Sequence, residues 1–360
     1  MINNNNIFND LTILMQTYER PLFAKRFMRY WSNKNIKIII IDGGKKSIED
    51  KFLKTLSKNI NYFHLPKDYY SRMIYSTSLI NTKFVLQACD DEFYITSAIK
   101  KCLELLNYNN ELVSCGGCCM GFDYLDKKII GNERYLKLQG LKLDNLDPMK
   151  RLLMHFSNYV PAHLYSVCRS DIWKIAVNST FSKEYNFFAA LELQMEMLII
   201  SAGKSMIIPE LFWLRSSENK PINNTSPSFL RENTLESWWI NNKFYDERND
   251  FFSRMNLAKD EMNKLNNIKH DINFRECFDL FIKKNNTSQI KNLVKSNLYK
   301  YEKLYKFFSK FKKIFLTMLE KKPYSFYEMA NYLKSKSIKI DYLELDDIYK
   351  QIESFHKIKI

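Results

Sequence analysis

The chain has 360 residues, enough for a large core, and its 46% hydrophobic and 26% charged residues are typical of a folded globular protein. With only 8 glycines and 8 prolines, it is neither a fibrous repeat nor a disordered chain. A formal charge of +15 suggests an anionic partner or surface, but the basic residues form no recognisable nucleic-acid-binding motif, so nucleic acid is not expected.

The amino terminus and the cysteines indicate a cytoplasmic protein. The chain begins with a polar asparagine run, and its apolar runs fall short of the roughly 20 residues of a membrane-spanning helix. Seven cysteines, three of them at Cys115, Cys118 and Cys119, do not suggest a secreted disulfide framework. Cys115 and Cys118 have the spacing of half a zinc site, but no second ligand pair follows, so we expect them in a buried strand.

Strand and helix patterns alternate through the first 215 residues. In chain order, the predicted strands are residues 10–15, 36–41, 61–65, 84–89, 112–115 and 206–209, and the predicted helices are residues 21–32, 48–57, 69–80 and 183–200. Such alternation favours right-handed βαβ units and a mainly parallel sheet with helices on both faces. The predicted fold class is therefore α/β.

Three carboxylates follow directly on the buried strand 84–89. Asp90, Asp91 and Glu92 are costly to place at such a strand end unless a cation meets them, and a hard divalent metal with bound phosphate is a suitable one. The alternative is that the acids are hydrated or cap a helix that begins near Phe93.

Two other strand ends carry polar turns. The first strand leads into Gln16–Pro21, and the second ends in Asp42-Gly43-Gly44. Ligands of open parallel sheets lie beyond the carboxyl ends of the strands, so the three strand ends together predict a nucleotide pocket with a metal. As alternatives, Asp42 only begins a turn and Arg20 pairs with a surface acid.

These segments resemble those of GT-A glycosyltransferases related to the large family-2 group. Leu14–Pro21 is similar to their opening strand and turn, Ile38–Gly44 to their second strand with its terminal acid, and residues 90–92 to their DxD motif. The resemblance covers about residues 10–215. It implies a Rossmann-like GT-A fold, nucleotide binding by Thr17, Arg20, Asp42, Gly43, Arg72, Asp90 and Asp91, and metal binding by Asp90 and Glu92.

Glycosyl transfer also needs a base for the acceptor hydroxyl and positive charge for the leaving diphosphate. By the same resemblance, Glu192 is the first candidate for the base and Glu196, one helical turn later, is the reserve. Arg215 and Arg169 are the candidates for the diphosphate, because guanidinium grips phosphate oxygens in bidentate fashion. The alternatives are a solvated helix acid and structural ion pairs.

The positions of the histidines depart from the pattern of the family. Many metal-using relatives supply a later histidine as a ligand, whereas the next histidine after Glu192 in this chain is His270, beyond a predicted linker. Two options stay open: Mg²⁺ or Mn²⁺ is held by few protein groups, or the metal is dispensable and arginines neutralise the leaving group.

A polar, turn-rich run at residues 216–228 predicts a domain boundary. We expect a catalytic domain over residues 1–215, a linker over 216–230 and an α-helical appendage over 231–360, with helices at 235–241, 274–283, 294–319 and 346–356. Residues 294–322 have the pattern of a basic amphipathic helix. Such a helix either lies on an anionic membrane surface or packs on its own domain.

The expected function is therefore an inverting glycosyltransferase that moves a sugar from a nucleotide-sugar donor to a saccharide or glycolipid acceptor. Bacterial surface-polysaccharide synthesis at the inner face of the cell membrane would fit such an enzyme. One alternative is a sugar nucleotidyltransferase, although Gln16–Pro21 lacks the glycines of a phosphate-binding loop. The other is a non-enzymatic, membrane-associated interaction protein.

Overall fold

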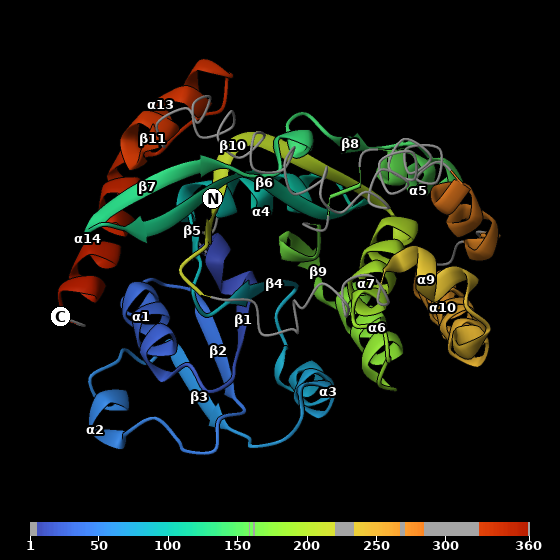
Figure 1. Cartoon of the computed structure of the whole chain (residues 1–360), viewed down its shortest axis with the longest axis horizontal. Helices are drawn as coiled ribbons and strands as arrows, with labels where there is room; N and C mark the ends of the chain where they lie inside the picture. The colour runs from blue at the N-terminus through green and yellow to red at the C-terminus, as the bar shows by residue number, and fades with distance from the viewer. Residues whose placement is uncertain are drawn as a thin grey trace, which may run out of the picture.

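The computed structural model describes residues 6–157, 159–160, 163–219, 234–266, 271–283 and 324–358. At its centre is one sheet with the strand order β11-β7-β6-β9-β4-β1-β2-β3, and β10 pairs with β6 and with the short strands β5 and β8 (Figure 1). Helices flank this sheet, so the predicted α/β class is confirmed.

The first part of the sheet is parallel. It consists of β1 (Leu11–Thr17), β2 (Lys37–Asp42), β3 (Ile60–His64) and β4 (Phe84–Cys89), joined by helices α1 (Pro21–Trp31), α2 (Asp50–Leu53) and α3 (Tyr69–Leu79). Proline suits the first position of α1 because it has no N–H to leave unpaired there. All strands of this part therefore point their carboxyl ends to one edge.

Helix α2 is shorter than the predicted helix 48–57. The backbone N–H of Ile48 donates to the hydroxyl of Tyr62 at 3.0 Å, and Glu49 makes no side-chain hydrogen bond to the start of the helix. The anchored Ile48 and the missing cap at Glu49 place the start of α2 at Asp50, two residues later than predicted.

The second part of the sheet is mixed. It contains β5 (Phe93–Tyr94), β6 (Leu112–Leu125), β7 (Lys128–Glu133), β8 (Lys142–Leu143), β9 (Val167–Arg169) and β10 (Lys204–Ser216), with α4 (Thr96–Tyr108) between β5 and β6. Strand β9 is antiparallel to both β4 and β6, whereas β10 runs parallel to β6. Cys115, Cys118 and Cys119 are buried in β6, as the sequence predicted.

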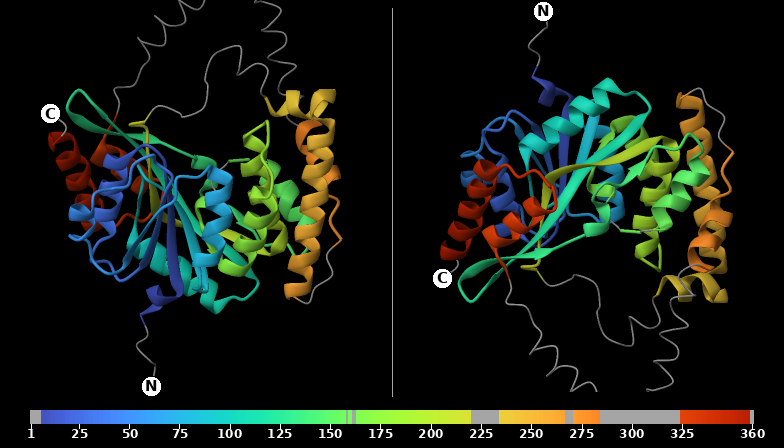
Figure 2. Two further views of the ribbon diagram at one scale, coloured as in Figure 1. Left: turned by 90° about the horizontal axis from the view of Figure 1, so that it is seen from below. Right: turned by 90° about the horizontal axis from the view of Figure 1, so that it is seen from above.

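Further helices cover one side of this mixed part. They are α5 (Pro148–Ser157), α6 (Ser170–Phe181), α7 (Ala189–Ala202), α9 (Leu235–Ile240), α10 (Tyr245–Asn266) and the helix over residues 274–283. Helix α10 packs on α6 and α7 from outside, as both views of Figure 2 show. The predicted helices 235–241 and 274–283 are thus present.

The predicted helix 183–200 begins later, at Ala189. Before it, the backbone N–H of Tyr185 donates to the Tyr70 hydroxyl at 3.0 Å, and that of Asn186 donates to Glu247 at 2.9 Å. Tyr185 and Phe187 are also buried. These contacts with α3 and α10 hold the segment in an irregular conformation that the local pattern does not reveal.

The last described segment returns to the sheet. It forms β11 (Tyr324–Ser325), α13 (Phe326–Ser335) and α14 (Tyr342–Ile358); β11 pairs with β7, and α14 packs on α1 (Figures 1 and 2). The predicted helix 346–356 lies within α14. The predicted amphipathic helix at 294–322 and most of the linker 216–230 lie outside the described residues, and the domain division stays a prediction.

No described helix combines the length and the apolar character that crossing a bilayer requires.

Candidate functional site

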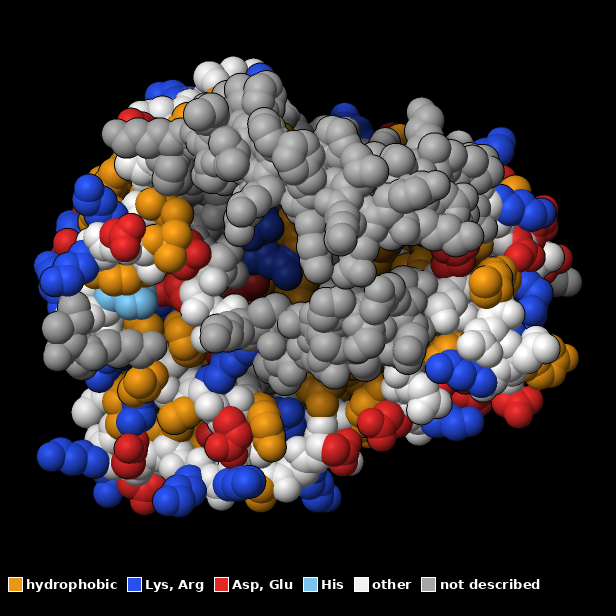
Figure 3. All heavy atoms as spheres, viewed as in Figure 1, with side chains coloured by type: hydrophobic (Ala, Val, Ile, Leu, Met, Phe, Trp, Pro, Cys, Tyr) orange, Lys and Arg blue, Asp and Glu red, His pale blue; other side chains and the backbone are white. Residues whose placement is uncertain are grey.

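A pocket of about 760 Å³ opens where the carboxyl ends of β1 and β4 face the amino-terminal ends of α3 and α7. Of the residues predicted from the sequence, its wall contains Thr17, Arg20, Gly43, Arg72, Asp90, Asp91, Glu192 and Arg215. On the face shown in Figure 3, a hollow near the centre contains Lys and Arg side chains. The fold thus gathers residues from both halves of the predicted catalytic region.

Asp90 is held by the turn after β1. Its carboxylate accepts a hydrogen bond from the Thr17 hydroxyl at 2.7 Å and another from Arg20 at 3.3 Å, while the same Arg20 nitrogen lies 3.9 Å from Asp91. Burial and the charge of Asp91 raise the pKa of Asp90 to about 6, although Thr17 and Arg20 act against them. Arg20 therefore lies between the two carboxylates.

Arg72 lies over the Gly43 backbone. Its guanidinium donates to the Thr17 carbonyl at 2.7 Å and to Gln16 Oε1 at 3.2 Å, and a Cβ added at Gly43 would lie 2.6 Å from it. Only glycine at position 43 leaves room for this guanidinium. Burial lowers the pKa of Arg72.

Asp42, at the end of β2, is not part of the pocket wall. Its carboxylate is buried, accepting from the backbone N–H of Gly44 at 2.8 Å and from the Tyr62 hydroxyl at 2.7 Å. Asp42 thus shapes the Gly43-Gly44 turn, which is the turn role that the sequence left open.

Glu192 faces the pocket from the first turn of α7. Burial, together with the charge of Glu196, raises the pKa of Glu192 to about 7. A carboxyl group with this pKa can take up a proton near neutral pH.

Glu196 is fully buried and does not reach the pocket wall. It accepts from the backbone N–H of His163 at 2.9 Å and lies 3.0 Å from Nε2 of His155. Burial lowers the pKa of His155 to about 3, so this histidine is neutral near pH 7. We therefore leave Glu196 out of the candidate bases.

The two candidate arginines differ in position. Arg215, near the end of β10, lines the pocket; its Nε lies 3.9 Å from Glu92, and its guanidinium carbon lies 5.1 Å from the centre of the Tyr135 ring. Arg169 is paired with Phe84, at the opposite end of β4 from Asp90, and donates to the carbonyls of Leu106, Asn109 and Leu112. The predicted diphosphate role of Arg169 is thus not supported, because its guanidinium is bound to backbone far from the pocket.

The predicted metal ligands Asp90 and Glu92 have different partners in the protein. Glu92 accepts from the indole N–H of Trp213 at 2.6 Å, and burial, then Asp91, raises its pKa to about 8. Asp90 and Asp91 offer the oxygen atoms that Mg²⁺ prefers, but Arg20 already lies between them. Within the described ranges, no group of three or more His, Cys, Asp or Glu side chains is placed to hold a metal ion. Each member of the predicted pair is therefore already bound within the protein, and metal binding by Asp90 and Glu92 stays a prediction.

Sequence reasoning missed several residues of the wall. Besides the predicted residues, the wall includes Tyr18, Lys45, Lys67, Tyr69 and Phe188. Phe188 lies four residues before Glu192, a spacing that places both residues on one side of a helix. This spacing could have predicted that Phe188 lies in the pocket wall with Glu192. The lysines lie in loops after β2 and β3, where no local pattern marks them.

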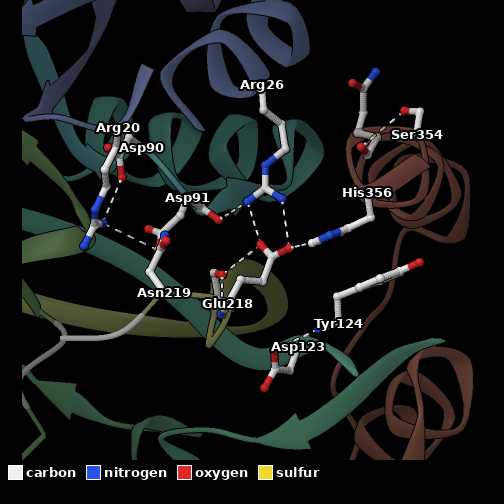
Figure 4. A network of polar contacts seen from close by, with 12 residues as sticks. Arg20, Arg26, Asp90, Asp91, Asp123, Tyr124, Glu218, Asn219, Ser354 and His356 are labelled. Atoms are coloured by element: carbon white, nitrogen blue, oxygen red, sulfur yellow. Dashed lines mark hydrogen bonds and ion pairs between the residues drawn. The ribbon is translucent and has the colours of Figure 1, made fainter. Parts of the chain in front are cut away.

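A second polar network lies beside Asp91 and is shown in Figure 4. Arg26 of α1 forms two hydrogen bonds with Glu218, at 2.8 and 3.2 Å, and His356 of α14 contacts the same carboxylate. Burial acts to raise the pKa of Glu218, but Arg26 and hydrogen bonds from Arg26, His356 and Ser216 hold it below its usual value. Glu218 falls in the predicted linker, and no local pattern marks its partners.

No protein-family profile and no curated protein matches this chain. Among solved structures, it is similar to crystal structures of S. aureus TarS. The 1–349 fragment in complex with UDP-GlcNAc is 11% identical, with a TM-score of 0.48 over 76% of this chain and 70% of that one. Another structure of the fragment is 10% identical (TM-score 0.41; 58% of this chain, 60% of that one). A structure of TarS outside this fragment series is 9% identical, with a TM-score of 0.40 over 57% of this chain and 36% of that one. These identities and TM-scores are too low to assign a family or an activity.

Proposed function

We propose that this protein is a GT-A-type glycosyltransferase that moves a sugar from a nucleotide-sugar donor to a hydroxyl of a saccharide or glycolipid acceptor, with inversion. The observation that carries the proposal is the pocket at the carboxyl ends of β1 and β4, where acidic and basic side chains meet a buried carboxyl group of near-neutral pKa. A surface-glycan acceptor and an anionic membrane partner remain predictions.

The donor would lie along the turns after β1, β2 and β4. Arg20 and Arg72 offer positive charge to a nucleotide, and Asp90 and Asp91 offer acceptors for ribose hydroxyls. Asp42 acts indirectly in this arrangement, since it holds the Gly43-Gly44 turn. The exposed rings of Tyr18 and Phe188 provide flat apolar surface in the same wall.

The reaction itself needs a proton acceptor and a stabilised leaving group. Glu192 takes the proton of the acceptor hydroxyl, and the hydroxyl oxygen forms a bond to the anomeric carbon of the donor. The bond from that carbon to the phosphate oxygen breaks, and the nucleotide leaves with the electron pair. Arg215, in the pocket wall, stabilises the negative charge that develops on it.

A requirement for Mg²⁺ or Mn²⁺ is open in this proposal, and no step is assigned to a metal. Arg20 already places positive charge between Asp90 and Asp91. We therefore expect the nucleotide to bind in the presence of EDTA, with at most a moderate gain on adding Mn²⁺.

Donor binding is tested by thermal shift and calorimetry with UDP-, GDP-, TDP- and CMP-sugars, each in EDTA, Mg²⁺ or Mn²⁺. Binding of one of them, followed by release of its nucleotide, supports transfer. Release of pyrophosphate from a nucleoside triphosphate and a sugar phosphate would instead identify a sugar nucleotidyltransferase. If no nucleotide binds, the non-enzymatic alternative stands.

The role of Glu192 is tested by Glu192→Gln. We expect nucleotide release from the bound donor to fall about 100-fold or more, because the base is lost, while donor affinity stays within about twofold. Glu184→Gln is the matched control, since Glu184 is an exposed carboxylate shortly before the same helix. Turnover retained by Glu192→Gln would remove Glu192 from the role.

A further inference from the structure

Glu218 lies two residues beyond the end of β10, and its side chain is buried rather than solvated. The side chains of Glu218 and Arg26 are 3% and 2% exposed, and they meet in the two-bond geometry of the strongest carboxylate pairs. Ser216 adds a further hydrogen bond to the same carboxylate at 2.9 Å. A buried pair of this kind stabilises a fold only when its remaining hydrogen bonds are also satisfied, as they are here.

Hydrogen bonds connect the pair to Asp91 in the pocket wall. Arg26 donates to the backbone carbonyl of Asp91 at 2.8 Å, and Asn219, next to Glu218, donates to the Asp91 carboxylate at 2.7 Å. Backbone and side chain of Asp91 are thus both held by the same small set of residues, as Figure 4 shows. Any shift of Glu218 would therefore reach Asp91 by two routes.

Helix α14 closes the other side of the pair. His356 contacts Oε1 of Glu218, which also accepts from Arg26, and stacks on Tyr124 of β6, with ring centres 3.7 Å apart. The neighbouring Phe355 ring lies 4.5 Å from the Arg26 guanidinium, which also faces Phe23 and Phe93. Arg26 and Glu218 are therefore enclosed by side chains from α1, β5 and α14.

We infer that Arg26, Glu218 and His356 form a clasp that positions Asp91 for the donor, so that helix α14 supports a site more than 250 residues earlier in the chain. The three side chains do not line the pocket and do no chemistry there. They act as positioning residues through Asp91 and Asn219. This inference rests on the proposed function only in assigning the donor to Asp91.

The clasp is tested with Glu218→Gln, His356→Phe and His356→Gln. Phenylalanine keeps a ring that can stack on Tyr124 but cannot hydrogen-bond Glu218, whereas glutamine restores a donor without the ring. Lys357→Ala is the matched control, because Lys357 is the next residue of α14 and its ion pair with Glu353 is exposed. All variants are made in the full chain. Their thermal unfolding is recorded so that exchange and affinity are compared only at temperatures where every variant is folded.

The first measurement is hydrogen exchange of the peptides that span residues 90–95 and 213–219. We expect faster exchange of both peptides in Glu218→Gln and His356→Phe and no change in Lys357→Ala, because only the first two break the clasp. The second measurement is calorimetric affinity for UDP, GDP, TDP and CMP. We expect the affinity for whichever nucleotide binds the wild type to fall at least tenfold in the first two variants, with partial recovery in His356→Gln.

The outcomes separate the inference from the proposed function. If both peptides exchange as in the wild type, or if they exchange faster while nucleotide affinity is unchanged, the positioning role is overturned. If the wild type binds none of the four nucleotides, the proposed function fails, whereas faster exchange in the two variants would still establish that α14 holds Asp91.

Discussion

At the scale of single residues, neighbours give chemically similar carboxyl groups different properties. Asp90 is bound by Thr17 and Arg20, Glu92 is enclosed beside Trp213, and Glu192 faces the pocket with only partial burial. Their pKa values rise to about 6, 8 and 7, respectively, with burial as the largest cause in each case. Among these three groups, Glu192 combines access to the pocket with a pKa suited to a base.

The carboxylate of Glu196 is expected to tune Glu192. Its negative charge raises the pKa of Glu192, so Glu196→Gln should lower that pKa and move the acidic limb of the rate against pH by roughly one unit to lower pH. Glutamine can keep hydrogen bonds to His155 and to the backbone of His163. The measurement is nucleotide release from the bound donor between pH 5 and 8.

Glu184→Gln is the control for this prediction as well, because Glu184 is exposed and is not a cause of the Glu192 shift. Superimposable profiles for Glu196→Gln and the wild type would show either that Glu196 is uncharged or that Glu192 does not control the rate.

At the scale of elements, helix α7 shows how packing separates two acids with similar sequence positions. Glu192 and Glu196 are one turn apart, but the pocket ends beside the first turn of α7 and α5 covers the next. Apart from Glu192, every residue from Ala190 to Ser201 is buried, so α7 is surrounded on all sides. Their one-turn spacing in the sequence therefore could not show which acid reaches the pocket. The position of the pocket beside the first turn of α7 shows that it is Glu192.

Helix α4 depends on a cap from a distant element. Ile95, which precedes α4, has no side chain to bond the first backbone N–H groups; the carboxylate of Glu344 in α14 accepts from Thr96 and Ser97 instead. We expect Glu344→Ala to lower the free energy of unfolding by about 1–2 kcal/mol, the usual cost of a lost cap. Urea unfolding followed by circular dichroism measures it.

Glu353→Ala provides the comparison, since Glu353 lies on the same helix and its ion pair with Lys357 is exposed. We expect a change within about 0.5 kcal/mol for this variant. Equal loss in both variants would mean that removing any carboxylate of α14 has this effect, and that the cap on α4 does not determine it.

At the scale of the whole molecule, the end of the chain completes a sheet that begins at residue 11. Strand β11 pairs with β7, α14 packs on α1, and Glu344 caps α4. Residues 234–266, in contrast, pack through α10 on α6 and α7. The described C-terminal residues thus contact the first 215 residues at two separate places.

The pH dependence of global stability should reveal the buried Glu92. Its pKa in the folded protein is raised to about 8, so between about pH 4.5 and pH 8 the folded state holds a proton that the unfolded state has lost. The contribution of Glu92 to stability therefore declines as pH rises through this window, by at most about 1.4 kcal/mol per unit. Glu92→Gln removes this decline and should gain melting temperature relative to the wild type from pH 5 to pH 8.

Melting curves at intervals of one pH unit measure this effect, with the exposed Glu104→Gln as the control. A constant difference between Glu92→Gln and the wild type at every pH would show that Glu92 ionises normally in the folded protein.

Local patterns in the sequence determined the strands and helices around the pocket. The apolar runs that become β1, β2 and β4 are buried on both faces of a parallel sheet, and such strands read as continuous hydrophobic segments. Because parallel strands end at one edge, the turns after them could be expected to meet. Thr17, Arg20, Gly43, Asp90 and Asp91 therefore lie together as the sequence predicted.

Only the tertiary structure decided which of the remaining candidates reach the pocket. Arg169 and Glu196 had suitable chemistry, but the antiparallel β9 and the packing of α5 place them elsewhere. Arg26, Glu218 and His356 come from three distant segments, and their pairing depends on how α1, β10 and α14 pack. Hydrophobic periodicity records which side of an element is buried, whereas partners across long sequence separations are set by the packing of whole elements, and no local pattern encodes them.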